Sequence, residues 1–306
     1  MDAKDMRAGR CAIIGRPNVG KSTLLNRLLG QKLVIATAKP GTTRSAVLGV
    51  YVSSDPPTQI AFVDTPGVAR PKSALHKVLV EQAQLSLVDC DVVLFMTEVP
   101  GVLKNPRVSE RDESALQAIA QVKAPVLLAF NKVDKLRDKS ALLPLIDAYQ
   151  KVRTFDAIVP VSATKGINIA PLVDEIRARL PEGALYEEDV LTDKPERFFV
   201  AELVREAVMR QTHREVPYGA AVVVDRFEVD GSLVRINATI IVEKNSHKGI
   251  VIGKGGSRLK AIGIEARQAM ESFLNQRVHL ELWVRVDAGW TADPERARRL
   301  VSQEEP

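Results

Sequence analysis

The sequence predicts an α/β fold of two domains, in which a six-stranded, mostly parallel sheet covered by helices precedes a smaller α+β domain. Over the first 180 residues, short apolar runs alternate with longer helical patterns, which is typical of a parallel sheet with helices on its faces. A polar stretch without periodicity follows, and a second pattern of helix, two strands, helix and strand begins near residue 197. The 306 residues, 45% of them hydrophobic, are enough for two cores.

Each apolar run of the first domain is expected to be one strand of the sheet. Only the second and third runs are joined by a short turn, at residues 53–57, so we expect these two strands to form an antiparallel hairpin. The expected strands are 10–14, 46–52, 59–63, 91–96, 125–130 and 157–161, followed in the second domain by a helix at 198–210, strands at 220–227 and 233–243, a helix at 257–274 and a strand at 278–286.

Composition excludes several classes of protein. No apolar run approaches the roughly 18 residues that a membrane-spanning helix needs. The first residues are charged and lack the apolar block of a secretory signal, so we expect a cytoplasmic location. Cys11 and Cys90 are too few for a disulfide framework and are expected to be reduced thiols. No basic amphipathic helix or lipidation motif favours a peripheral contact at the inner face of the cell membrane, but the sequence leaves that contact open.

A phosphate-binding loop stands directly after the first expected strand. Residues 15–22 match G-x-x-x-x-G-K-[ST] in its required setting between a strand and a helix. Backbone N–H groups of such a loop bind phosphate oxygens, Lys21 reaches the β- and γ-phosphates as a catalytic group, and Ser22 ligates magnesium. The predicted nucleotide-binding residues here are Gly15, Arg16, Pro17, Asn18, Val19, Gly20, Lys21, Ser22 and Thr23.

Two further segments are expected to sense the terminal phosphate. Asp64 ends the third expected strand and is positioned to hold magnesium through water, while the N–H of Gly67 meets the γ-phosphate, so that loss of this phosphate releases the following loop. In the loop at residues 39–45, Thr43 is preferred to Thr42 as the residue that completes magnesium coordination, and it is the second predicted catalytic group. The predicted residues of the first segment are Asp64, Thr65, Pro66, Gly67 and Val68.

Two motifs at the ends of the fifth and sixth expected strands predict recognition of guanine. A carboxylate such as that of Asp134 accepts from both the ring N1–H and the exocyclic amino group of guanine, whereas adenine offers neither donor at these positions. We therefore expect GTP rather than ATP, with Asn131 and Lys132 bracing the loop and a backbone N–H near Ala163 donating to the guanine carbonyl oxygen. The predicted residues are Asn131, Lys132, Val133, Asp134, Ser162, Ala163 and Thr164.

With these four motifs in order, the chain resembles the translation-factor-like GTPases, and its phosphate loop and the Thr-Thr-Arg segment at 42–44 resemble the Era family. The resemblance implies a Ras-like P-loop GTPase domain that binds GTP, GDP and Mg²⁺. Ras-type GTPases orient the attacking water with a glutamine where this chain has Val68, so we expect slow intrinsic hydrolysis. The resemblance also makes Asn18 a candidate ligand of a K⁺ ion that acts like an arginine finger. The alternative is that Asn18 only braces the loop.

The second domain carries a candidate RNA-binding loop. Residues 252–256 read Ile-Gly-Lys-Gly-Gly, which fits the Gly-x-x-Gly loop of a KH module, a clamp for about four nucleotides of single-stranded RNA. Between residues 244 and 277, lysine and arginine exceed glutamate by five, which is typical of a nucleic-acid footprint but also of a solvated helix face. Trp283 and Trp290 are expected to pack in the core rather than stack on bases. The predicted RNA-binding residues are Val251, Ile252, Gly253, Lys254, Gly255, Gly256, Arg258 and Lys260.

The order of elements is that of a type II KH domain, and residues 261–267 and 278–284 again resemble the Era family. The resemblance implies a GTPase of small-subunit assembly. From the pattern of elements we expect a GTPase domain at 1–180, a linker at 181–196 and a KH domain at 197–306, and we expect a monomer. Its implied partners are the 3′ end of small-subunit ribosomal RNA and the small ribosomal subunit, and no DNA. We expect GTP to order Thr43 and Gly67, reposition the domains around the linker and favour RNA capture.

Two alternatives stay open. As the GTPase partner of an RNA-modification enzyme, the chain would form a stable hetero-complex and bind RNA weakly alone. As a protein or membrane-surface adaptor with a degenerate KH fold, it would tolerate substitutions at Gly253 and Lys254. The intact basic loop disfavours both alternatives.

Overall fold

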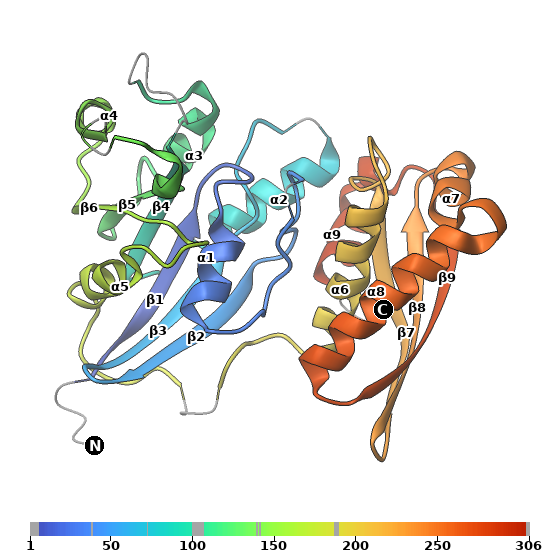
Figure 1. Cartoon of the computed structure of the whole chain (residues 1–306). Helices are drawn as coiled ribbons and strands as arrows, with labels where there is room; N and C mark the ends of the chain where they lie inside the picture. Colours follow the sequence, from blue (N-terminus) through green and yellow to red (C-terminus); the bar gives the residue numbers. More distant parts are fainter. Residues whose placement is uncertain are drawn as a thin grey trace. The chain divides into compact units, whose positions relative to one another are not determined.

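The computed structural model of the chain describes residues 6–37, 39–71, 73–99, 107–138, 140, 142–186 and 190–303 (Figure 1). Contacts divide the chain into two units. The first contains the residues up to Leu33, 43–70 and 79–193, and the second contains 34–42, 71–78 and the residues from Lys194 onward.

The first unit is built on a six-stranded sheet in the order β2-β3-β1-β4-β5-β6. β2 and β3 pair antiparallel, and every other neighbouring pair is parallel, so the expected sheet and its one hairpin are confirmed. The strands are β1 (Arg7–Ile14), β2 (Val47–Ser54), β3 (Pro57–Asp64), β4 (Val92–Glu98), β5 (Val126–Asn131) and β6 (Ala157–Pro160).

Helices cover the sheet, and this explains why its strands are continuous apolar runs rather than alternating ones. Every residue of β5 is buried, as are six of the seven residues of β4. The carboxyl ends of these parallel strands therefore lead into loops at one edge of the sheet, where ligands bind in such folds. The helices are α1 (Lys21–Leu28), α2 (Ala74–Leu85), α3 (Glu113–Ala118), α4 (Leu142–Gln150) and α5 (Ile169–Arg177), with short 3-10 helices η1 (Glu110–Asp112) and η2 (Val133–Lys135).

The stretch after α5 lies along the hairpin. The backbone N–H of Val50, on the edge strand β2, donates to the carbonyl of Leu191 at 2.8 Å. Gln59 of β3 is 1% exposed, and its side-chain oxygen accepts from the N–H groups of Leu185 and Tyr186 at 2.8 Å each. Leu185, Tyr186 and Leu191 therefore lie against the hairpin, with Leu191 on its edge strand β2.

The second unit contains a three-stranded sheet in the order β7-β8-β9, in which β8 pairs antiparallel with β7 and parallel with β9. Figure 1 shows α6 and α8 side by side on one face of this sheet. Their apolar residues and the inward residues of the strands form one core. The elements are α6 (Glu196–Gln211), β7 (Ala220–Asp230), β8 (Leu233–Val242), α7 (Asn245–Ile252), η4 (Lys254–Gly256), α8 (Ser257–Leu274), β9 (Arg277–Val286), η5 (Trp290–Ala292) and α9 (Pro294–Ser302).

Residues 34–42 follow α1 in sequence but group with the second unit. Ile35 belongs to its core, and the ammonium of Lys39 donates to the carbonyl oxygens of Met209 and Thr212. These carbonyls lie at the C-terminal end of α6, where the helix dipole favours a positive charge. The segment is therefore fixed to α6 by both packing and charge.

One of the two tryptophans differs from expectation. Trp290 is fully buried as expected, but Trp283 is 47% exposed, because it lies on the face of β9 opposite the core. Cys11 is buried and Cys90 is partly buried, and both are free thiols. Among the described residues, the structure contains no helix with the length and apolarity to span a bilayer.

Candidate nucleotide and RNA sites

The three side chains predicted as magnesium ligands lie together at the start of α1. The Ser22 hydroxyl donates to Oδ2 of Asp64 at 2.7 Å, and Thr43 Oγ1 lies 2.9 Å from the Ser22 oxygen and 3.2 Å from Asp64 Oδ2. Oδ1 of Asp64 is buried without a hydrogen-bond partner among the described residues. A hard divalent cation that takes oxygen ligands fits this donor set.

Thr42 points elsewhere. Its hydroxyl lies 2.7 Å from that of Thr37 and donates to the carbonyl of Lys39 at 2.7 Å. The hydroxyl of Thr43 is therefore the one that approaches Asp64 in this loop.

Lys21 lies inside the phosphate loop. Its ammonium donates to the carbonyl oxygens of Gly15 at 3.1 Å and Arg16 at 3.3 Å. Burial lowers the pKa of Lys21 to about 8, against the raising effect of Asp64. The same burial raises the pKa of Asp64, opposed by Lys21 and the two hydroxyl hydrogen bonds. The site therefore holds a desolvated cation where phosphate charge is expected.

The loop after β3 contacts the phosphate loop. A Cβ at Gly67 would lie 2.7 Å from backbone atoms of Pro17, so only glycine allows this approach. The N–H of Val68 donates to the carbonyl of Gly15 at 3.1 Å, and its side chain is buried in the apolar core. Thr65 donates its hydroxyl to the carbonyl of Ile13 and so braces β1 rather than facing a ligand.

The loops predicted to recognise guanine interlock with the phosphate loop. The amide of Asn131 donates to the carbonyl of Val19 at 2.7 Å, and its oxygen accepts from the N–H of Ala163 at 3.0 Å. Asp134 is exposed, and its Oδ1 accepts from the hydroxyl of Ser162 at 2.6 Å. The N–H of Ala163 itself is thus engaged by Asn131.

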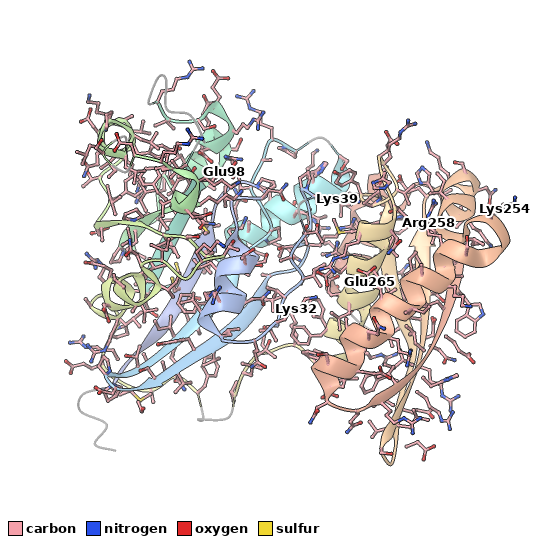
Figure 2. All side chains as sticks on the ribbon, in the orientation of Figure 1. Lys32, Lys39, Glu98, Lys254, Arg258 and Glu265 are labelled. Atoms are coloured by element: carbon pink, nitrogen blue, oxygen red, sulfur yellow. The ribbon has the colours of Figure 1, made fainter. Side chains whose placement is uncertain are left out.

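One residue that the sequence did not single out joins this site. Glu98, labelled in Figure 2, ends β4 and accepts from Arg16 at 2.7 Å and from the ammonium of Lys132. Lys132 also donates to the carbonyl of Asn18 at 2.9 Å. The guanidinium of Arg16 is therefore directed at Glu98, while only its backbone lies with the phosphate loop. The signal available in the sequence was the position of Glu98 at the carboxyl end of a parallel strand.

The candidate RNA-binding loop connects α7 to α8. Gly253 has φ +74°, and a Cβ there would lie 2.8 Å from Cβ of Arg258, so the turn requires glycine. Lys254 is exposed at the tip, and Figure 2 shows it projecting from the loop. Arg258 instead donates to the carbonyl of Ile250 and closes the end of α7.

A groove of about 420 Å³ adjoins this loop between α8 and β9. Ile264 lies in it and is 44% exposed, and Lys260 lines it as well. Val251 was predicted among the RNA-binding residues, but its side chain is fully buried in the core of the second unit and so is not available to a ligand at the surface. The groove was missed because its lining is divided between a helix and a strand. The lining residues are Gly256, Leu259, Lys260, Gly263, Ile264, Arg267, Leu280 and Leu282.

Comparisons with known proteins identify a family for each part of the chain. A family described as 50S ribosome-binding GTPase matches residues 10–132, and the KH domain family matches residues 215–291. The chain is 44% identical to GTPase Era of Trichlorobacter lovleyi over 302 residues, covering 98% of this chain and 99% of that one. It is 48% identical to GTPase Era of Geotalea uraniireducens over 294 residues, covering 95% and 96%.

Two solved structures are similar over nearly the whole chain. One is Era in complex with MgGDPNP and nucleotides 1506–1542 of 16S ribosomal RNA, with 43% identity, a TM-score of 0.90 and coverage of 96% of this chain and 98% of that chain. The other is a variant of Aquifex aeolicus Era bound to GDP and AlF4⁻, with 43% identity, a TM-score of 0.90 and coverage of 96% and 99%.

Proposed function

The chain belongs to the Era family of GTPases, and we propose from this premise that it is a GTP-driven switch which binds the 3′ end of small-subunit ribosomal RNA and assists assembly of the small ribosomal subunit. The observation that carries the proposal is the presence, in one chain, of the Ser22–Thr43–Asp64 cluster and of a KH loop with an adjoining groove. We place this activity in the cytoplasm and assign it to a monomer.

The residues of the nucleotide site divide the work of GTP hydrolysis. Lys21 would leave the loop carbonyls for the β- and γ-phosphates, where its charge offsets the charge of the transition state. Ser22, Thr43 and Asp64 would hold Mg²⁺, which neutralises phosphate charge when bound. Asp134 would read guanine, and Gly67 would donate its N–H to the γ-phosphate.

The loss of the γ-phosphate removes the partner of Gly67 and a reason for Thr43 to stay ordered. Both segments would then relax, which is how GTPase switches report hydrolysis. We assign RNA capture to the GTP state and release to the GDP state.

We also propose that Asn18 ligates K⁺ during hydrolysis. Its φ of +66° turns the phosphate loop at this point, so Asn18→Gly removes the carboxamide without a backbone penalty. The expected result is faster GTP hydrolysis in K⁺ than in Na⁺ for the natural chain and equal rates for the variant. Equal rates in the two buffers for the natural chain would assign Asn18 to bracing alone.

The deciding experiment for the overall function is the rate of GTP hydrolysis in K⁺ buffer with and without a short single-stranded RNA copied from the 3′ end of small-subunit ribosomal RNA. An RNA of the same composition in scrambled order is the control. We expect stimulation by the first RNA only. GTP binding without stimulation would leave a GTPase whose trigger is a protein partner.

A further inference from the structure

The two halves of the nucleotide site come from distant parts of the sequence and must keep a fixed spacing to hold one nucleotide. The phosphate loop follows β1, and the loop with Lys132 follows β5. Between them in the sheet lies β4, which pairs with β1 on one side and with β5 on the other. The residue that ends β4 is therefore placed between both loops.

That residue is Glu98, and its carboxylate contacts a cation from each loop. Oε1 accepts from Nη2 of Arg16 at 2.7 Å, and Oε2 accepts from Nζ of Lys132. All three side chains are largely shielded, with exposures of 13% for Arg16, 27% for Glu98 and 26% for Lys132. Shielding strengthens such ion pairs relative to exposed ones.

We propose that Glu98 is a positioning residue for nucleotide binding: it fixes Arg16 of the phosphate loop and Lys132 of the guanine loop to one strand end, so that both loops are preorganised for a single nucleotide. This inference rests on the proposed function, because the loops are assigned to GTP there.

Each of the two cations also has a second partner besides Glu98. Nε of Arg16 lies 3.0 Å from Oδ1 of Asp112. Asp112 is fully buried and accepts at 2.7 Å from the hydroxyls of Thr97 and Tyr149. The Arg16 guanidinium therefore lies between the carboxylates of Glu98 and Asp112.

Lys132 is held in the same way. It has a φ of +66°, an uncommon conformation for a residue with a side chain, and its ammonium also donates to the carbonyl of Asn18 at 2.9 Å. Loss of Glu98 would leave this bond as the main restraint on the lysine. Ordering the loops would then be part of binding, which lowers affinity.

The charge state of Glu98 suits the role. Burial raises the pKa of its carboxyl, but the hydrogen bonds from Lys132 and Arg16 outweigh burial and hold the pKa below its ordinary value. The group is thus ionised at neutral pH. Glu98→Gln keeps the shape and removes the charge that both cations share.

The test compares Glu98→Gln with Glu175→Gln. Glu175 of α5 forms an ion pair at 2.7 Å with Arg179, two residues beyond the end of that helix, so it controls for the loss of one carboxylate. We expect Glu98→Gln to speed dissociation of fluorescent GDP and GTP analogues on the order of tenfold and to raise KM. We expect kcat at saturating GTP to stay within about twofold, since Glu98 touches no reacting group. Glu175→Gln should match the natural chain.

Arg16→Gln removes the contact between Arg16 and Glu98 without changing a residue of β4. If Glu98 acts through the two cations, the double variant Arg16→Gln/Glu98→Gln should lose less affinity than the sum of the single losses. Unchanged dissociation in Glu98→Gln would overturn the proposal, as would additive losses or a kcat that falls as much as affinity. Failure of the natural chain to bind GDP would instead refute the proposed function.

Discussion

At the scale of single residues, we assign the choice of base to Asp134. Its exposed carboxylate is held by Ser162 at 2.6 Å. An asparagine at this position would still accept from Ser162, but it would offer the base a donor in place of an acceptor. Asp134→Asn is therefore expected to weaken the binding of guanine nucleotides by roughly two orders of magnitude and to favour the binding of xanthine nucleotides. Competition of fluorescent GDP by XDP and GDP measures both effects.

Asp138→Asn is the matched control for this change. Asp138 lies in the same loop, and its carboxylate accepts from the hydroxyl and N–H of Ser140. This variant should keep the natural preference. A preference for guanine that survives Asp134→Asn would refute the role of Asp134.

At the scale of elements, the loop between α7 and α8 is expected to affect how RNA binding depends on salt concentration. Lys254 is exposed on the loop, whereas Arg258 is engaged with Ile250. Each phosphate contact releases a counterion. Lys254→Ala should therefore weaken RNA binding and reduce the steepness with which the log of the association constant falls against the log of salt concentration by about one. Arg258→Ala should act instead by loosening the end of α7.

Titrations of the RNA at several salt concentrations test this difference. Lys123→Ala, an exposed change in the first unit, is the control and should leave the slope as it is. An unchanged slope in Lys254→Ala would mean that the loop does not contact the RNA backbone.

The contact of Leu191 with β2 predicts how a truncated first unit behaves. A fragment of residues 1–180 lacks Leu191 and so exposes the N–H of Val50 on the edge strand, together with apolar surface on Leu48. Unpaired edges of this kind promote association between chains. A fragment of residues 1–193 keeps the contact of Leu191 and is expected to unfold several degrees higher and to remain monomeric.

Thermal unfolding and size-exclusion chromatography of the two fragments measure this. GDP binding should be present in both, because none of the predicted nucleotide-binding residues lies beyond Thr164. Equal melting temperatures and elution volumes would show that the contact contributes nothing.

The strands were predictable because burial on both faces makes them continuous apolar runs, as in β5. The helix α9 was not predicted, although Asp293 caps it through the N–H of Glu295 at 3.0 Å and a proline follows the cap, which is a recognised start signal.

The contacts of Glu98 with Arg16 and Lys132 could not have been predicted from the sequence. Its partners Arg16 and Lys132 lie 82 and 34 residues away in sequence. Which side chains pair across such distances depends on sheet order, and a local pattern does not contain that order.

At the scale of the whole molecule, the chain passes from one unit to the other within a single peptide bond. Thr42 groups with the second unit, and Thr43 belongs to the cluster with Ser22 and Asp64 in the first. We therefore expect a non-hydrolysable GTP analogue to strengthen RNA binding relative to GDP by about 5- to 150-fold, the usual range of such coupling.

Thermodynamic linkage makes the prediction reciprocal. RNA must strengthen binding of the analogue, relative to GDP, by the same factor. Titrations of RNA against each nucleotide complex, and of each nucleotide against the RNA complex, measure the two factors independently. Equal affinity of RNA for the two nucleotide complexes would mean that the units act independently.

The strand order of the large sheet also determines when each strand can pair during synthesis of the chain. β1 is the first strand to be translated, yet its neighbours are β3 and β4, and the bond from Val50 to Leu191 forms only when nearly two thirds of the chain exists. At about 5–20 residues per second, the interval from β1 to Leu191 is on the order of ten seconds or more. β1 meets both of its neighbours only after β4 has been translated, and the edge strand β2 meets Leu191 only at the end of the interval, so the rate of translation limits how early the sheet can be completed.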